Sequence, residues 1–418
     1  MPIFHQQTKH SYMSVRKNAH FLDWQSQPTN HKLYPHFNQR FKIEEYEELT
    51  DLNLIGGITF EKSYPDGVYH LRSVPSAGGL FPFEVYIQVR GIKGLLDGIY
   101  HYEPHRASLT LLQEIGRDGV EHYFKDSLKQ KGLVFLISSV YFRSSWKYND
   151  RAIRYILLDV GHQLGAIYTA LSLMGRENEF VFDFDKLSLN EVFGFRDDEM
   201  FMCSVRSSEA SETSIDKLRQ GLPFVSGCDY LETNRFIEDA YKQSAVYEEP
   251  NFNPPNFFEN IPKEQLRQAI VNRRSIRAFR AQPMSDEEFW FIMGGLFQFA
   301  KEHAIDIYYT ANLVTNMSQG LYKNGELLEE GDFRSKSRYL ALEQNLGGQS
   351  GVTFFFTSNE AKKYQKVNIL SGFLAHIIYI RSELMGIGCS GIGAYYDDEC
   401  KEFLQTKNNI LYLLAIGR

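Results

Sequence analysis

The sequence has few cysteines, no long apolar run and no excess of positive charge. Its four cysteines lie far apart without a Cys-x-x-Cys pair, which favours reduced thiols over a disulfide framework or a zinc site. The 12 histidines show no paired ligand spacing, so we expect no metal. A formal net charge of -7 argues against nucleic acid as a partner. The sequence also has no run of about 18 apolar residues, so we expect no membrane span. We therefore expect a cytoplasmic protein.

The length and composition indicate two globular domains. The chain has 418 residues, of which 43% are apolar and 23% are charged. Residues 1–42 are rich in aromatic and turn-forming residues, which predicts an extended arm anchored by Leu22, Trp24 and Tyr34. Residues 209–261 carry four prolines and many polar residues, which predicts a linker. The two domains are then expected at 43–208 and 262–418.

Apolar patterning predicts the elements of the first domain. Strands are expected where apolar residues alternate or run together, and helices where their spacing is near 3.6 residues. The segment 151–174 has helical spacing and is apolar on two sides, which predicts a central core helix ended by Gly175. The strands are expected at 85–89, 98–102, 108–112 and 133–137, and further helices at 43–54 and 119–131.

The second half of the chain repeats the order of the first. Val85 precedes Gly98 by the same interval as Ile307 precedes Gly320. The apolar run 134–137 has a counterpart at 352–356, and the helix segment 161–175 has one at 372–386. These ordered coincidences predict a fused pseudo-dimer of two α+β units.

The segment 71–89 contains a loop whose backbone is nearly bare. Small residues leave N–H groups open to a large flat ligand, although Gly-Gly beside Pro is also common in ordinary turns. The residues of this loop are Pro75, Ser76, Ala77, Gly78 and Gly79, and the resemblance described below implies that they bind a cofactor.

A cluster of arginines occurs only in the second half. Arg273, Arg274 and Arg277, with Ser275 among them, predict a phosphate clamp, because guanidinium groups are forked donors that stay charged. An exposed run of surface charge is the alternative. The glycine-rich segment 386–398 and the terminal segment 414–418 also have no counterpart in the first half.

An insert at 144–151 occurs only in the first half. It contains Lys147 next to Tyr148, and Arg151 and Arg154 follow. A lysine whose proton affinity is lowered by burial or by neighbouring cations can act as a general base. The alternative is a helix N-terminus capped by Asp150, with Lys147 in solvent.

Together these motifs resemble the SagB-type dehydrogenases of the FMN-dependent nitroreductase superfamily. The resemblance rests on Arg-x-x-Pro-Ser-Ala-Gly-Gly-Leu-Phe-Pro-x-Glu-x-Tyr at 72–86, on Arg-Arg-Ser-x-Arg at 273–277, and on the glycine-rich and terminal segments. It implies a nitroreductase-like fold in two copies and an FMN cofactor. The loop would lie against the flavin ring and the arginines would hold the phosphate. The further cofactor-binding residues that it implies are Gly391, Ile392, Gly393 and Arg418.

The halves retain different motifs, which predicts one FMN per chain. The first half lacks the Arg-Arg-Ser-x-Arg motif and has only Arg40 in the corresponding stretch. The second half lacks the glycine loop, because the corresponding residues 298–303 contain no glycine. One pseudo-symmetric site is therefore expected to be lost. We expect a monomer, as a pseudo-dimer, or a homodimer.

The insert is similar to that of the azoline-oxidising branch of this family. Trp-Lys-Tyr-x-x-Arg-x-x-Arg at 146–154, followed by Leu-Asp-x-Gly-His, implies that Lys147 and Tyr148 are catalytic, whereas we expect His162 to be a core residue. The resemblance implies oxidation of a thiazoline or oxazoline in a peptide or a small molecule, with a biosynthetic partner enzyme. The alternatives are a generic NAD(P)H-dependent nitro- or quinone reductase and a non-catalytic partner in a modification complex.

Overall fold

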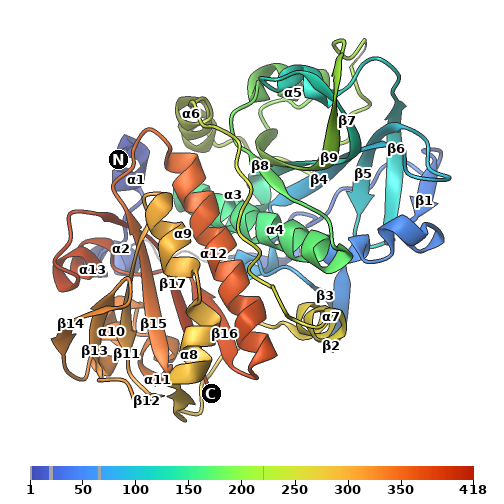
Figure 1. Cartoon of the computed structure of the whole chain (residues 1–418). Coiled ribbons are helices and arrows are strands. Elements are labelled where there is room, and N and C mark those ends of the chain that lie inside the picture. The colour runs from blue at the N-terminus through green and yellow to red at the C-terminus, as the bar shows by residue number, and fades with distance from the viewer. Residues whose placement is uncertain (1, 18–21, 65–66, 220) are drawn as a thin grey trace. The chain divides into compact units, whose positions relative to one another are not determined.

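The structure, a computed structural model, describes residues 2–17, 22–64, 67–219 and 221–418. The chain divides into two compact units. The first unit is Asp23–Phe258, and the second joins the described residues up to Leu22 to Glu259–Arg418. Each unit has its own sheet and its own long central helix (Figure 1).

The first unit is built on a seven-stranded sheet in the order β1-β6-β5-β4-β7-β9-β8. The apolar segments predicted as strands pair antiparallel, with Tyr86 opposite Leu136 and His101. A separate hairpin pairs β2 with β3. The strands are β1 Arg40–Lys42, β2 Ile58–Tyr64, β3 Gly67–Arg72, β4 Phe83–Arg90, β5 Gly98–Glu103, β6 Ser108–Glu114, β7 Leu128–Val140, β8 Glu179–Val181 and β9 Glu199–Ser214.

The helix α4 fills the core on one face of this sheet. It runs from Ala152 to Met174 as predicted and ends at Gly175, whose φ of 72° suits glycine. Side chains of β7 alternate, so Val134 and Leu136 join an apolar cluster separate from α4. A window within Phe142–Met174 is apolar and long enough to cross a membrane, but 94% of it is buried inside the protein. The other helices of this unit are α3 Phe142–Tyr148, α5 Lys186–Val192 and α6 Arg235–Ser244.

The second unit repeats this topology in a six-stranded sheet ordered β14-β13-β11-β15-β17-β16. Strands β11, β13, β15 and β17 have the neighbours that β4, β5, β7 and β9 have in the first unit, and α12 takes the place of α4 in chain order. The predicted repeat is therefore present in the fold. Strands β10 and β12 pair separately from the six-stranded sheet. The strands of the second unit are β10 Met284–Ser285, β11 Asp306–Ala311, β12 Val314–Thr315, β13 Gly320–Lys323, β14 Glu326–Glu330, β15 Val352–Ser358, β16 Gly388–Ile392 and β17 Asn409–Gly417.

Helices cover the second sheet with apolar side chains. On one face, Phe355 and Leu413 pack in a cluster with Leu340 and Tyr395. The helix α8 begins with a capping box between Ser285 and Glu288. The helices are α1 Ile3–Gln7, α2 Tyr12–Lys17, α7 Lys263–Asn272, α8 Asp286–Met293, α9 Leu296–Glu302, α10 Arg334–Leu340, α11 Asn345–Gln349, α12 Tyr364–Leu384 and α13 Asp397–Phe403.

Two predicted helices of the first unit are wrong. Residues 43–54 form three short 3₁₀ turns, at Ile43–Glu45, Glu47–Leu49 and Leu52–Ile55. Buried Leu49, Leu52 and Ile55 recur every three residues, which suits a 3₁₀ turn. In 119–131 only Val120–Tyr123 is helical, because β7 already begins at Leu128 and pairs with β9.

The arm and the linker also differ from the expectation. The arm forms α1 and α2, which belong to the second unit, while Tyr34 is buried in the first unit. Trp24 is 57% exposed and so is no buried anchor. The segment 209–261 lies in the first unit as far as Phe258, since Glu209–Ser214 continue β9 and α6 buries Ile237 and Tyr241. The structure of these segments depends on pairing with distant strands and on burial, and local composition does not indicate either.

Candidate active site

Ser76 and Ala77 tie the predicted cofactor loop to the central helix of the first unit. The Ser76 hydroxyl donates to Asp159 Oδ2 at 2.6 Å, and the Ala77 N–H donates to the same carboxylate at 3.1 Å. The Ser76 Oγ also accepts a hydrogen bond from the Phe81 N–H at 2.9 Å, which closes the loop. The loop conformation is thus held at both ends by side chains rather than by a regular sheet.

Asp159 is a residue that the sequence analysis did not select. It lies within the Leu-Asp-x-Gly-His motif, and α4 buries it beneath the loop. Burial raises the pKa of Asp159 to about 7, although the hydrogen bonds from Ser76 and Ala77 oppose that rise. The motif itself was the signal that could have identified it.

The two glycines of the loop present exposed backbone. Gly78 and Gly79 have φ of 67° and 69°, a region that glycine adopts without steric cost. A Cβ added at Gly78 would lie 2.8 Å from the Tyr148 hydroxyl and 3.2 Å from Lys147 Nζ. The loop and the Lys-Tyr insert, which are distant in sequence, therefore meet at Gly78.

Arg143 anchors the short helix α3 that carries the Lys-Tyr pair. Its buried guanidinium donates to the carbonyls of Phe81 and Gly227 and, at 2.5 Å, to Glu84 Oε1. Burial opposes ionisation of Glu84, but the charge of Arg143 and the hydrogen bond from His101 hold the pKa of Glu84 well below its usual value. Arg143 lies four residues before Lys147, so the same helix joins the loop exit to the candidate base.

Aromatic rings flank Lys147 and Tyr148, which are both half-buried. The Lys147 Nζ lies 4.6 Å from the centroid of the Trp24 ring, in a cation–π contact. The Tyr148 ring lies 4.5 Å from the Tyr155 ring. Trp24 is itself placed by an edge contact with Trp146 at 5.8 Å. Lys147 is therefore not fully in solvent, unlike in the alternative interpretation of the insert as a capped helix N-terminus. His162 is buried within α4, as expected for a core residue.

In the second unit, Arg273, Ser275 and Gly391 meet at Tyr379 of α12. The Ser275 hydroxyl lies 2.9 Å from the Tyr379 hydroxyl, which also accepts the Gly391 N–H at 2.7 Å. The guanidinium of Arg273 lies 5.4 Å from the centre of the Tyr379 ring. The sequence gives no signal for Tyr379, because a tyrosine in a buried helix resembles any core residue.

The other predicted residues of the second unit have different surroundings. Arg273 is buried, which lowers its pKa to about 10, and Arg274 donates to the carbonyl of Val271. Arg277 is exposed, and Arg418 pairs with Glu288. The segment Gly391-Ile392-Gly393 follows Tyr379 in the chain: Ile392 packs in an apolar cluster, and a Cβ at Gly391 would lie 2.0 Å from the Tyr412 hydroxyl.

Each unit has a feature that fits one part of a flavin nucleotide. In the first unit, the exposed glycine backbone can accept a flat ring system. In the second unit, a buried guanidinium beside a hydroxyl fits a phosphate. FMN would supply hydride transfer, which protein side chains lack. Within the residues that the structure describes, no group of three His, Cys, Asp or Glu side chains could hold a metal ion.

Comparison with known proteins assigns the fold. No family model matches the chain. A crystallised protein from Anabaena variabilis that is named as a nitroreductase covers 99% of this chain, with 98% of its own length, at a TM-score of 0.82 and 21% identity. The chain therefore has a nitroreductase-like fold in two copies, as predicted.

Two further comparisons are more limited. A Methanocaldococcus jannaschii protein that carries the name nitroreductase is 27% identical over 152 residues, which are 36% of this chain and 73% of that protein. A chain of the Escherichia coli microcin synthetase McbBCD complex with truncated pro-MccB17 bound covers 49% of this chain, with 85% of its own length, at 15% identity. Its TM-score of 0.31 is too low to support a comparison of sites. The Anabaena and Methanocaldococcus proteins both carry the name of an oxidoreductase class.

Proposed function

We propose that this protein is an FMN-dependent dehydrogenase that oxidises a heterocycle such as a thiazoline or an oxazoline in a peptide or a small molecule. The observation that carries the proposal is the meeting of Lys147 and Tyr148 with the exposed backbone at Gly78. A plain reductase needs a flavin-binding loop but has no evident use for a Lys-Tyr pair beside it. A substrate placed over this loop would have both side chains within reach.

The proposed reaction removes a proton and a hydride from adjacent substrate atoms. Lys147, as the neutral amine, would accept the proton directly or through the Tyr148 hydroxyl. FMN would supply the hydride acceptor when bound. As placed, the Lys147 ammonium lies against the Trp24 indole. Either the bound substrate displaces Trp24 from the Lys147 amine, or the proton passes from the substrate to Lys147 through the Tyr148 hydroxyl. Arg143 and Asp159 act by positioning, because each fixes backbone on which the pair or the loop depends.

The test compares Lys147→Ala and Tyr148→Phe with the unmodified protein. Oxidation of a synthetic thiazoline peptide should fall about 10²–10⁴-fold, the usual effect of losing a general base. FMN content and reduction of the flavin by dithionite should stay unchanged, since neither side chain belongs to the proposed phosphate clamp. Near-normal oxidation by both variants would refute the proposal, and loss of FMN would assign a structural role to the insert.

The second candidate function is an NAD(P)H-dependent nitro- or quinone reductase. It is favoured by the names of the Anabaena and Methanocaldococcus relatives. Turnover of a nitroaromatic compound with NADPH, at rates that Lys147→Ala leaves intact and without any oxidation of the thiazoline peptide, would favour this reading. A purified protein without flavin absorbance would instead favour the third alternative, a non-catalytic partner in a modification complex.

A further inference from the structure

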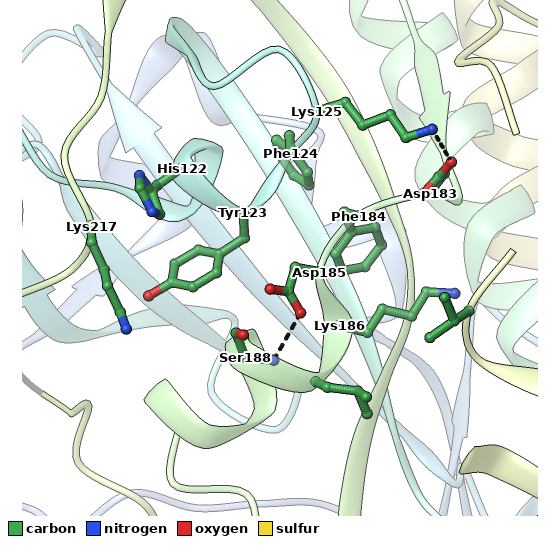
Figure 2. A pocket seen from close by; sticks show the side chains of 12 residues that line it. His122, Tyr123, Phe124, Lys125, Asp183, Phe184, Asp185, Lys186, Ser188 and Lys217 are labelled. Atoms are coloured by element: carbon green, nitrogen blue, oxygen red, sulfur yellow. Dashed lines mark hydrogen bonds and ion pairs between the residues drawn. The ribbon is translucent and has the colours of Figure 1, made fainter. Parts of the chain in front are cut away.

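A pocket in the first unit shares no residue with the candidate active site. Its volume is about 500 Å³, which is within the usual range for small-molecule sites. Segments 122–125 and 183–188 form its walls, and Lys217 and Val246 complete the lining (Figure 2).

One buried hydroxyl in this pocket lacks a hydrogen-bond partner. The Tyr123 side chain is 5% exposed, and its hydroxyl meets no acceptor or donor in the part of the chain that the structure describes. Burial raises the pKa of Tyr123 to about 12, so the group is a neutral donor at physiological pH. Buried polar groups are almost always paired, and a ligand acceptor would satisfy this one.

Most charged groups around the pocket already have a hydrogen-bond or ion-pair partner. Lys125 pairs with Asp183 at 2.5 Å, and Asp185 accepts the Ser188 N–H at 3.0 Å (Figure 2). The ammonium of Lys186 donates to the Ala245 carbonyl at 2.9 Å. Lys217 is exposed and, among the described residues, has no carboxylate partner. Lys217 is thus the lining cation that is left for a ligand.

The orientation of the polar and apolar groups gives the pocket two ends. In Figure 2 the Tyr123 hydroxyl and the Lys217 ammonium point toward the same end, where the ring of His122 also lies. The His122 ring contacts the Tyr123 ring at 5.4 Å and is fixed by the Ile215 carbonyl, 3.2 Å from Nδ1. Phe124 and Phe184, whose rings meet edge to face at 5.5 Å, provide an apolar wall.

We propose that this pocket binds a monocarboxylate with an aromatic body. The carboxylate would accept from Tyr123 and pair with Lys217, while the ring would pack on Phe124 and Phe184. A dianion such as a phosphate ester fits less well, because the carboxylates of Asp183 and Asp185 line the same space. The proposal does not depend on the function proposed for the Lys-Tyr site.

The experiment uses 4-fluorobenzoate as the probe, observed by ¹⁹F NMR in titrations of the full-length protein. We expect saturable binding that weakens about tenfold in Lys217→Met and in Tyr123→Phe, because each change removes one hydrogen-bond donor to the carboxylate. Lys93→Met, at an exposed lysine outside the pocket, should bind the probe as the unmodified protein does. Lys217 is also exposed, so Lys217→Met tests the site without disturbing the core.

Three outcomes would overturn the proposal. One is the absence of saturable binding by the unmodified protein. Another is equal affinity in the unmodified protein, Lys217→Met and Tyr123→Phe. The third is tighter binding of 4-fluorophenyl phosphate than of 4-fluorobenzoate, which would assign the pocket to a different class of anion. Weak binding of 4-fluorotoluene relative to 4-fluorobenzoate would support the role of the carboxylate.

Discussion

At the scale of single residues, the two loop glycines have similar backbones but different surroundings. Both have positive φ, so an alanine at either position adopts a strained conformation. A Cβ at Gly78 would meet the Lys-Tyr pair, whereas a Cβ at Gly79 would meet no atom within 4 Å. A side chain at Gly78 would therefore clash with the Lys-Tyr pair in addition to straining the backbone, whereas a side chain at Gly79 would only strain the backbone.

This difference predicts the effects of two matched variants. Gly78→Ala and Gly79→Ala should each lose about 1–2 kcal/mol of stability from left-handed backbone strain. Gly78→Ala should in addition displace Tyr148 and Lys147, and oxidation of the thiazoline peptide should fall at least tenfold further than in Gly79→Ala. Urea unfolding and steady-state kinetics measure the two effects. Equal activities in the two variants would show that the contact at Gly78 has no part in the reaction.

At the scale of elements, α4 positions the loop and Arg143 fixes the helix that carries the candidate base. The hydrogen bonds from Ser76 and Ala77 to Asp159 tie the loop to α4, and Arg143 ties α3 to the strand that follows the loop. Both ties use an ionisable group that burial isolates from water. The position of the site therefore depends on ionisable groups that do not themselves react.

The carboxyl of Asp159 predicts a pH-dependent stability. Its folded-state pKa of about 7 lies above the ordinary value near 3.9, so its contribution is fully present below about pH 4 and is lost as pH rises through 7. Relative to Asp159→Asn, the unmodified protein should lose up to about 1.4 kcal/mol of unfolding free energy per pH unit in that window.

Urea unfolding at several pH values between about 4.5 and 8 measures this loss. Asp239→Asn, at an exposed carboxyl in α6, is the control and should follow the unmodified protein. Parallel pH profiles for Asp159→Asn and the unmodified protein would contradict the raised pKa.

At the scale of the whole molecule, the two units share a topology but carry different functional residues. The first unit has the glycine loop and the Lys-Tyr pair, and the second has the cluster of Arg273, Ser275 and Gly391 at Tyr379. In the first unit, Arg40 is bound to Glu103 and so belongs to the sheet rather than to a phosphate clamp. This asymmetry supports the expectation of one FMN per chain, which stays a prediction.

Quantification of released FMN against protein should give about one equivalent per chain. Arg273→Ala or Ser275→Ala should weaken FMN binding about tenfold to more than a hundredfold, since a hydrogen bond to a charged group contributes about 1.5–3 kcal/mol. Arg40→Ala should leave FMN affinity unchanged, even though it breaks the ion pair with Glu103. Two equivalents of FMN per chain, or equal losses in the Arg40 and Arg273 variants, would contradict the assignment of the two units.

The sequence by itself determined the features that depend on local patterning. The central helix 152–174, the strands around Val85 and Val134 and the internal repeat follow from apolar periodicity, which the burial of each face enforces along the chain. The glycine loop, the arginine cluster and the Lys-Tyr insert were found as motifs because their residue types are chemically specific. The nitroreductase-like fold was predicted from these motifs by resemblance.

Only the tertiary structure decided which distant residues meet. Asp159, Arg143 and Tyr379 are separated in sequence from the groups they bind, and nothing in their local sequence names those partners. The pocket at Tyr123 likewise needs segments from across the first unit, and the strand in the expected linker needs its pairing with β7. Burial and strand pairing are properties of the folded chain, because they depend on which surfaces come together and remove one another from water.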